Sequence, residues 1–251
     1  MDQSYVKHTV ENGVANITFY NPSHNALPGK LLSKLESEIK ACGENDSVNV
    51  IVLQSGGDRT FCAGASFNEL IVINDETEGL KFFSGFAKVI NAMRACPKFI
   101  ICKVQGKAVG GGVGIAAASD YCLATTFAAV KLSELSIGIG PFVIEPAVSR
   151  KIGVSAMSEM TINAESFFSA QWALEKGLFA KVVQTKTELD IEAKDLAEKL
   201  STYNPEAVKA MKAVMWQNTE HWDQLLLERA KISGKLVLSD FTKSILSKYK
   251  V

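Results

Sequence analysis

The stretch Gly106–Asp120, GKAVGGGVGIAAASD, holds five glycines within its first nine residues and follows the apolar run KFIICKVQ. The β-branched and apolar residues of that run predict a buried strand. The segment GGGVGIAAAS, which starts at Gly110, predicts the beginning of a helix. The first amides of a helix lack intrahelical partners, and glycines let a ligand approach them closely. One interpretation of the stretch is therefore a site for an anion or for a developing oxyanion.

Two other interpretations of the glycines compete with an oxyanion site. Gly112, Gly114 and Ala117 match the pattern G-x-G-x-x-A of dinucleotide-binding folds. However, GKAV separates them from the strand, where that pattern needs a tight turn, and the next short strand, AAVKL, carries no acidic residue at its end. The simpler alternative is that small residues only let this helix pack closely. No Lys-Ser/Thr pair follows the glycines, so a phosphate-binding loop of the P-loop type is excluded.

A second turn of small residues, TFCAGASF (Thr60–Phe67), follows another predicted buried strand, VNVIVLQS (Val48–Ser55). Two parallel strands that each end in such a turn can bring two backbone N–H groups together. Two donors that converge on one oxygen form an oxyanion hole, and removing one donor costs roughly 3–4 kcal/mol in characterised enzymes. The pair of turns therefore favours the oxyanion interpretation.

Strand patterns alternate with helical patterns up to about residue 185, and only helical patterns follow. YVKHTV and ANITFY predict an opening hairpin, and Pro28 begins a helical pattern. Ser169 and Asn204 are typical helix caps before later helical segments. This order predicts an α/β core with a helical C-terminal part.

Composition narrows the classes of partner. Lys and Arg number 27, as do Asp and Glu, so we expect no general attraction to nucleic acid or to an anionic membrane. No apolar run approaches the roughly 20 residues of a membrane span, and MDQSYVKHTVENG resembles no signal or transit peptide. Five irregularly spaced cysteines favour reduced thiols, and three scattered histidines argue against a histidine metal site. We therefore expect a cytoplasmic protein with no metal.

Five motifs together resemble the crotonase (enoyl-CoA hydratase/isomerase) superfamily, in its order and spacing. They are NPSHNAL (21–27), FCAGASF (61–67), PKFIICKVQGKAVGGGVGIAAASD (97–120), KLSELSIGIGP (131–141) and SAQWALEKGLFAKVV (169–183). The resemblance implies an α/β fold of the ClpP-like type, a spiral of ββα turns over residues 1–190, with a helical region over 191–251 that serves oligomerisation. It also implies a homotrimer or a dimer of trimers, an acyl-CoA thioester as substrate, and no cofactor beyond the coenzyme A of that substrate.

The resemblance also implies roles for individual residues. The backbone N–H groups of Ala65 and Gly111 correspond to the two oxyanion donors, and Glu134 corresponds to a catalytic carboxylate. The remaining substrate-binding positions that we expect are Ser23, His24, Asn25, Ala63, Gly64, Gly110, Gly112, Gly114, Pro141 and Phe142.

The chain departs from the hydratase pattern at two places. Gly114 stands where hydratases of this family commonly carry a first glutamate, and PFVIEP (141–146) replaces a glycine-rich segment near their catalytic water. Addition of water needs one group to activate the water and a proton for C2, whereas a double-bond shift needs only one base that returns its proton elsewhere. GIGPF is also similar to the apolar loop of the enoyl-CoA isomerases.

An enoyl-CoA isomerase that uses Glu134 as its single proton shuttle is therefore the leading hypothesis. An enoyl-CoA or methylglutaconyl-CoA hydratase is the alternative, with Glu145 as a substitute acid. A decarboxylase or lyase that uses the same oxyanion hole, and an acyl-CoA-binding pseudoenzyme, remain further alternatives.

Overall fold

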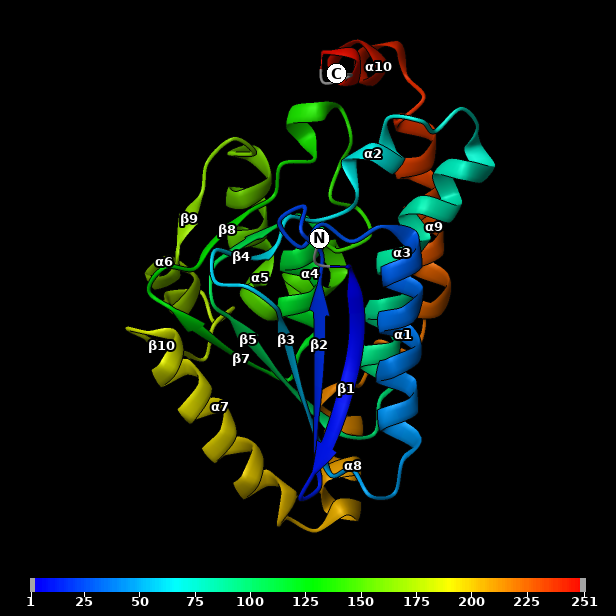
Figure 1. Cartoon of the computed structure of the whole chain (residues 1–251). Coiled ribbons are helices and arrows are strands. Elements are labelled where there is room, and N and C mark those ends of the chain that lie inside the picture. The colour runs from blue at the N-terminus through cyan, green and yellow to red at the C-terminus, as the bar shows by residue number, and fades with distance from the viewer. Residues whose placement is uncertain (1–2, 249–251) are drawn as a thin grey trace.

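Two β-sheets form the framework of the protein, whose computed structural model describes residues 3–248 (Figure 1). In the six-stranded sheet the strand order is β1-β2-β3-β5-β7-β10; β1 and β2 form the predicted hairpin, and the other neighbours run parallel. Its strands are β1 (Tyr5–Glu11), β2 (Val14–Tyr20), β3 (Val50–Ser55), β5 (Phe99–Val104), β7 (Tyr121–Thr125) and β10 (Lys181–Val183).

The four-stranded sheet, β4-β6-β8-β9, is built from very short strands. They are β4 (Thr60–Cys62), β6 (Lys107–Val109), β8 (Ala129–Lys131) and β9 (Phe168–Ser169). The sequence predicts a loop at β4 and places β6 inside the glycine stretch, because two or three residues show no periodicity. In each of three successive units, a strand of the large sheet leads into a strand of the small one and then into helical structure: β3-β4, β5-β6 and β7-β8. This repeat is the predicted spiral of ββα turns.

Seven helical segments lie within the spiral: α1 (Gly29–Glu44), α2 (Phe67–Leu70), α3 (Glu76–Ala95), α4 (Gly111–Ala118), the 3₁₀ turn η1 (Leu135–Ile137), α5 (Glu145–Ile162) and α6 (Ala170–Glu175). The predicted cap Ser169 accepts a hydrogen bond from the amide of Trp172 at 3.1 Å. Pro28, expected at the first helical position, is the N-cap residue of α1, and the helix begins one residue later at Gly29.

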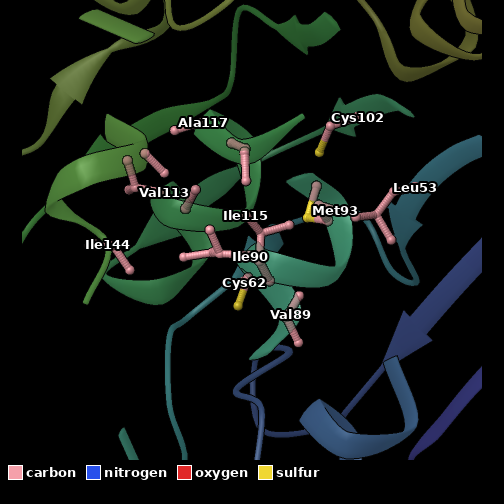
Figure 2. Close-up of a cluster of buried hydrophobic side chains, with 14 of the residues drawn as sticks. Leu53, Cys62, Val89, Ile90, Met93, Cys102, Val113, Ile115, Ala117 and Ile144 are labelled. Carbon is pink, nitrogen blue, oxygen red and sulfur yellow. The ribbon is translucent and has the colours of Figure 1, made fainter. Parts of the chain in front are cut away.

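Helix α4, which the glycine stretch forms, lies at the centre of the core. All eight of its residues are buried, and it is apolar on every side, as a helix enclosed by other elements should be. Figure 2 shows its side chains Val113 and Ile115 beside Ile90 and Met93 of α3. The small residues of this segment therefore allow α4 to pack closely in the core, in addition to leaving its N-terminus open to a ligand.

Four helices follow in the described part of the chain: α7 (Lys186–Ser201), α8 (Pro205–Met215), α9 (Trp222–Leu236) and α10 (Asp240–Ser247). Helix α7 covers one face of the large sheet (Figure 1), where Leu189 and Ala193 pack in one cluster with Val50 and Val52 of β3. The expected boundary at residue 190 thus falls inside α7. The described part of the helical region packs on the core of its own chain, and residues 1–2 and 249–251 of the two expected regions lie outside the description. A trimer or a dimer of trimers stays a prediction.

A buried ion pair joins α8 to the core. The Nζ atom of Lys212 donates to Asp120 Oδ2 at 2.9 Å, and both side chains are almost fully buried. Asp120 Oδ1 accepts from Trp216 Nε1 at 2.8 Å, and Oδ2 also accepts from the amide of Ile100 at 2.7 Å. Asp120, at the end of the glycine stretch, therefore has a structural role.

Among residues 3–248, none of the helices has an apolar stretch long enough to cross a lipid bilayer. Within the same range no group of three or more His, Cys, Asp or Glu side chains is placed to bind a metal ion. All five cysteines are buried free thiols.

Candidate active site

A cavity of about 190 Å³ lies where the two predicted turns meet the turn that carries Glu134. The turn after β4, the N-terminus of α4, the segment from Ser133 to Ile144, and helices α2, α3 and α9 form its walls. Lining residues are Ala63, Gly64, Ala65, Phe67, Leu70, Phe82, Phe83, Phe86, Val109, Gly110, Gly111, Ser133, Glu134, Ile137, Ile139, Gly140, Pro141, Phe142, Val143, Ile144 and Ser233.

Gly64 places the amide of Ala65 in the wall of this cavity. Its φ of +90° is a conformation that residues with side chains rarely adopt, and a Cβ atom there would lie 3.1 Å from the carbonyl oxygen of Val109. The Gly64 carbonyl accepts a hydrogen bond from the amide of Leu27 at 2.8 Å, and Leu27 pairs with Ala65 in a short parallel bridge. The turn is therefore fixed between the segment before α1 and the end of β6.

Gly110 and Gly111 form the adjoining part of the cavity wall. The φ of Gly110 is +54°, and its amide donates to the carbonyl of Lys131 at 2.9 Å. Gly111 begins α4, and Phe86 leaves no room for a side chain there. Within residues 3–248, the amides of Ala65 and Gly111 donate to no other protein group. A Cβ atom on Gly64 would lie 3.8 Å from the Gly111 nitrogen, so the two turns are in contact. This arrangement suits the stabilisation of negative charge on one oxygen.

Glu134 precedes η1 and extends its carboxyl group toward the same glycines. A Cβ atom on Gly110 would lie 2.7 Å from Glu134 Oε1. The residue borders the cavity, but its Oε2 atom is buried and has no hydrogen-bond partner. Burial raises the pKa of this carboxyl from its ordinary value of 4.5 to about 7, and the residue's own backbone N–H lowers it only in part. Such a group can accept and release a proton near neutral pH.

The position of Gly114 has no space for a second carboxylate. A Cβ atom there would lie 2.5 Å from Cγ2 of Ile144 and 3.5 Å from Cδ1 of Ile90. Figure 2 shows Ile144 directed toward α4. Ile144 also lines the cavity, so an apolar side chain lies beside the position at which the sequence has no first glutamate. Gly114 itself does not line the cavity and thus acts through the packing that it permits.

Glu145, the possible auxiliary acid of the hydratase alternative, is not among the residues that line the cavity. It is the first residue of α5, and its Oε1 accepts from the Ser149 hydroxyl at 2.7 Å. Its Oε2 lies 3.9 Å from a guanidinium nitrogen of Arg229 on α9. Among the described lining residues, Glu134 alone has an ionisable side chain.

The other expected binding residues divide into two groups. Ala63, Gly64, Gly110, Pro141 and Phe142 line the cavity. Gly112 does not line the cavity. Its small size instead lets α4 approach β4, since a Cβ atom there would lie 2.7 Å from the carbonyl oxygen of Cys62.

Ser23, His24 and Asn25 also lie outside the cavity. His24 and Asn25 border a separate surface hollow, and both have positive φ. The Asn25 amide group donates to the carbonyls of Gly56 and Thr60, each at 2.8 Å, so it holds two loops together. A contact of this segment with the adenine half of coenzyme A stays a prediction.

The aromatic wall from α3 and the contribution of α9 are not predicted by the sequence. Phe82, Phe83 and Phe86 line the cavity from one side, and Ser233 reaches it from a helix nearly 150 residues later in the chain. The apolar residues of α3 look like any core-facing helix pattern, so only the structure distinguishes core from cavity wall.

Comparisons with known proteins identify the family and the fold of the chain. The family model described as enoyl-CoA hydratase/isomerase matches residues 9–243. The chain is 28% identical to a probable enoyl-CoA hydratase of Bacillus subtilis, over 93% of this chain and 91% of that protein. It is 27% identical to a peroxisomal Delta(3,5)-Delta(2,4)-dienoyl-CoA isomerase of Arabidopsis thaliana, over 86% and 81% of the two chains. A crystal structure of enoyl-CoA hydratase from Bacillus halodurans superimposes with a TM-score of 0.91 at 22% identity, covering 98% of this chain and all of the other, and so shows the same fold.

Proposed function

Because this chain belongs to the enoyl-CoA hydratase/isomerase family, we propose that it is an enoyl-CoA isomerase that moves a C=C bond from C3 to C2 of an acyl-CoA thioester. The amides of Ala65 and Gly111 hold the thioester oxygen, and Glu134 carries the proton. Both groups border one cavity, which also has the apolar walls that exclude water from such chemistry.

The proposed reaction proceeds in two proton transfers. The Glu134 carboxylate takes the proton from C2, and the electrons of that C–H bond form a dienolate whose charge rests on the thioester oxygen. The two amides stabilise this charge. Glu134 then gives its proton to C4 while the carbonyl reforms and a C2=C3 bond appears. Because Glu134 ends in its starting state, no other acid or base is consumed.

The observation that carries this proposal is the close contact between Gly114 and Ile144. A second carboxylate is what hydration would require in order to hold and deprotonate water, and Ile144 occupies the space for it. The pKa of Glu134, about 7, also suits a group that is both base and acid in one cycle.

The direct test is turnover of a 3-enoyl-CoA by the purified protein, followed by the appearance of the conjugated 2-enoyl thioester. A Glu134→Ala variant should lose the activity by about 10²–10⁴-fold. A variant as active as the wild type would refute the assigned role.

Hydration is the second candidate, since a probable enoyl-CoA hydratase is among the relatives. Crotonyl-CoA, which already has a C2=C3 bond, tests it separately from isomerisation. We expect hydration far below the rate of isomerisation; hydration as the faster reaction would favour the hydratase and would require a water-activating group other than Glu145.

A further inference from the structure

The cavity extends along helix α3, which forms one of its walls. Phe86 lies against Gly111 at the N-terminus of α4, and Phe82 lines the cavity one helical turn earlier. Another turn back, Gly79 contacts Gly234 of α9, next to Ser233 in the cavity wall. The cavity wall therefore runs from Gly111 along α3 toward its N-terminus.

The lining residues of α3 end at Phe82, and beyond it α3 comes into contact with α9. A Cβ atom on Gly79 would lie 2.7 Å from the Gly234 carbonyl oxygen, so the two backbones touch at this point, which we take as the end of the space for a ligand. Gly79 and Phe86 are seven residues apart, which is about 10 Å along a helix that rises about 1.5 Å per residue. An extended chain advances roughly 1.2 Å per bond, so about eight bonds fit between Gly111 and this closed end.

The charge of the cavity walls also restricts which acyl chains can bind. Among the described lining residues no Lys, Arg or His is present, and the Glu134 carboxyl is the one ionisable group. A carboxylate at the end of an acyl chain would lose its hydration without gaining a cation, and ionised Glu134 would repel it. The hydroxyl of Ser233 is the polar group that α9 offers there.

We propose that the substrate carries an uncharged acyl chain of no more than about eight carbons, with its end between Phe82 and Ser233. This inference rests on the proposed function, because it takes the thioester carbonyl to lie at Gly111. It excludes dicarboxylic acyl-CoA thioesters and long-chain fatty acyl-CoA thioesters as preferred substrates.

Calorimetric titration with saturated acyl-CoA thioesters tests it without turnover. From butyryl- to octanoyl-CoA, affinity should rise about fourfold per carbon, the fold-change that corresponds to about 0.8 kcal/mol per buried CH₂. It should rise no further from decanoyl- to palmitoyl-CoA, and adipyl-CoA should bind at least tenfold more weakly than hexanoyl-CoA. Affinity that keeps rising to palmitoyl-CoA, or equal binding of adipyl- and hexanoyl-CoA, would overturn the proposal.

Two variants should move the length limit in opposite directions. Phe82→Ala should shift the tightest ligand to a longer chain, and Ser233→Leu should shift it to a shorter one. Matched controls are Phe127→Ala and Lys235→Leu, at exposed positions outside the cavity wall, which should leave the series unchanged. A limit that neither variant moves would contradict the assigned end of the cavity.

The outcomes separate this inference from the isomerase proposal. A chain-length limit without turnover of 3-enoyl-CoA thioesters would refute the reaction and leave the inference standing. Turnover of 3-enoyl-CoA thioesters, together with an affinity that keeps rising with chain length, would refute the chain-length inference and leave the isomerase proposal standing.

Discussion

Replacing Glu134 by Gln should change stability in a way that depends on pH. Burial raises the pKa of this carboxyl from 4.5 to about 7 in the folded protein. At 1.36 kcal/mol per pKa unit, the folded state loses about 3 kcal/mol by holding the ionised group. Because the folded pKa is the higher one, this penalty is absent below about pH 4.5, grows between pH 4.5 and 7, and is complete above pH 7.

The Glu134→Gln variant is neutral at every pH, so its stability relative to the wild type should improve by about 2–3 kcal/mol between pH 5 and pH 8. Any constant cost of the amide in this site cancels in that difference. Urea unfolding of both proteins at the two pH values measures it, with Glu165→Gln at an exposed position as the control.

The same substitution should lower isomerase activity although it raises stability. The same Glu134→Gln protein, although more stable at pH 8, should isomerise a 3-enoyl-CoA about 10²–10⁴-fold more slowly. Wild-type activity should rise with pH through about 7, as the carboxylate form becomes available. Equal pH dependence of unfolding in wild type and variant would refute the burial argument on which these expectations rest.

Three further substitutions test separate parts of the structure. Glu145→Gln should leave isomerase activity within about threefold of wild type, since its side chain lies outside the cavity wall; a larger loss in the kinetic assay would reinstate it as an acid. Gly114→Ala should lower the free energy of unfolding by about 1–3 kcal/mol, because the new methyl group would lie 2.5 Å from Ile144; unchanged urea unfolding would show that Ile144 moves freely. Lys212→Met should cost about 3–5 kcal/mol, because the buried Asp120 carboxylate loses its cation; calorimetry that detects no destabilisation would contradict this account.

The sequence predicted the elements whose apolar residues recur at a clear period or form a continuous run. The hairpin, the buried strands β3 and β5, the helix after Pro28 and the Asn204 cap of α8 all agree with the structure. Strands β4, β6 and β9 were not predicted, since two or three residues in a sheet made of other short strands leave no pattern. Their positions depend on pairing with partners that are distant in sequence.

The site was predictable from the sequence at the positions where the backbone conformation requires glycine. Gly64 and Gly110 have positive φ, and glycine is the residue that adopts it without strain. Glu134 required the family resemblance, because a lone glutamate in SELS carries no signal of its burial. The packing of Ile144 against Gly114 joins two residues thirty positions apart, and neither one alone indicates that the other fills its space.

The carboxylate of Asp120 has a consequence for how the chain is made. Its partners come from residues 100, 212 and 216, so the central spiral is complete in sequence long before its charge is neutralised. During synthesis from the N-terminus, the amide of Ile100 is already present, but this acid has no cation until α8 has left the ribosome. A chain terminated before residue 205 would lack that cation, so its buried carboxylate should make it less stable than the full-length protein.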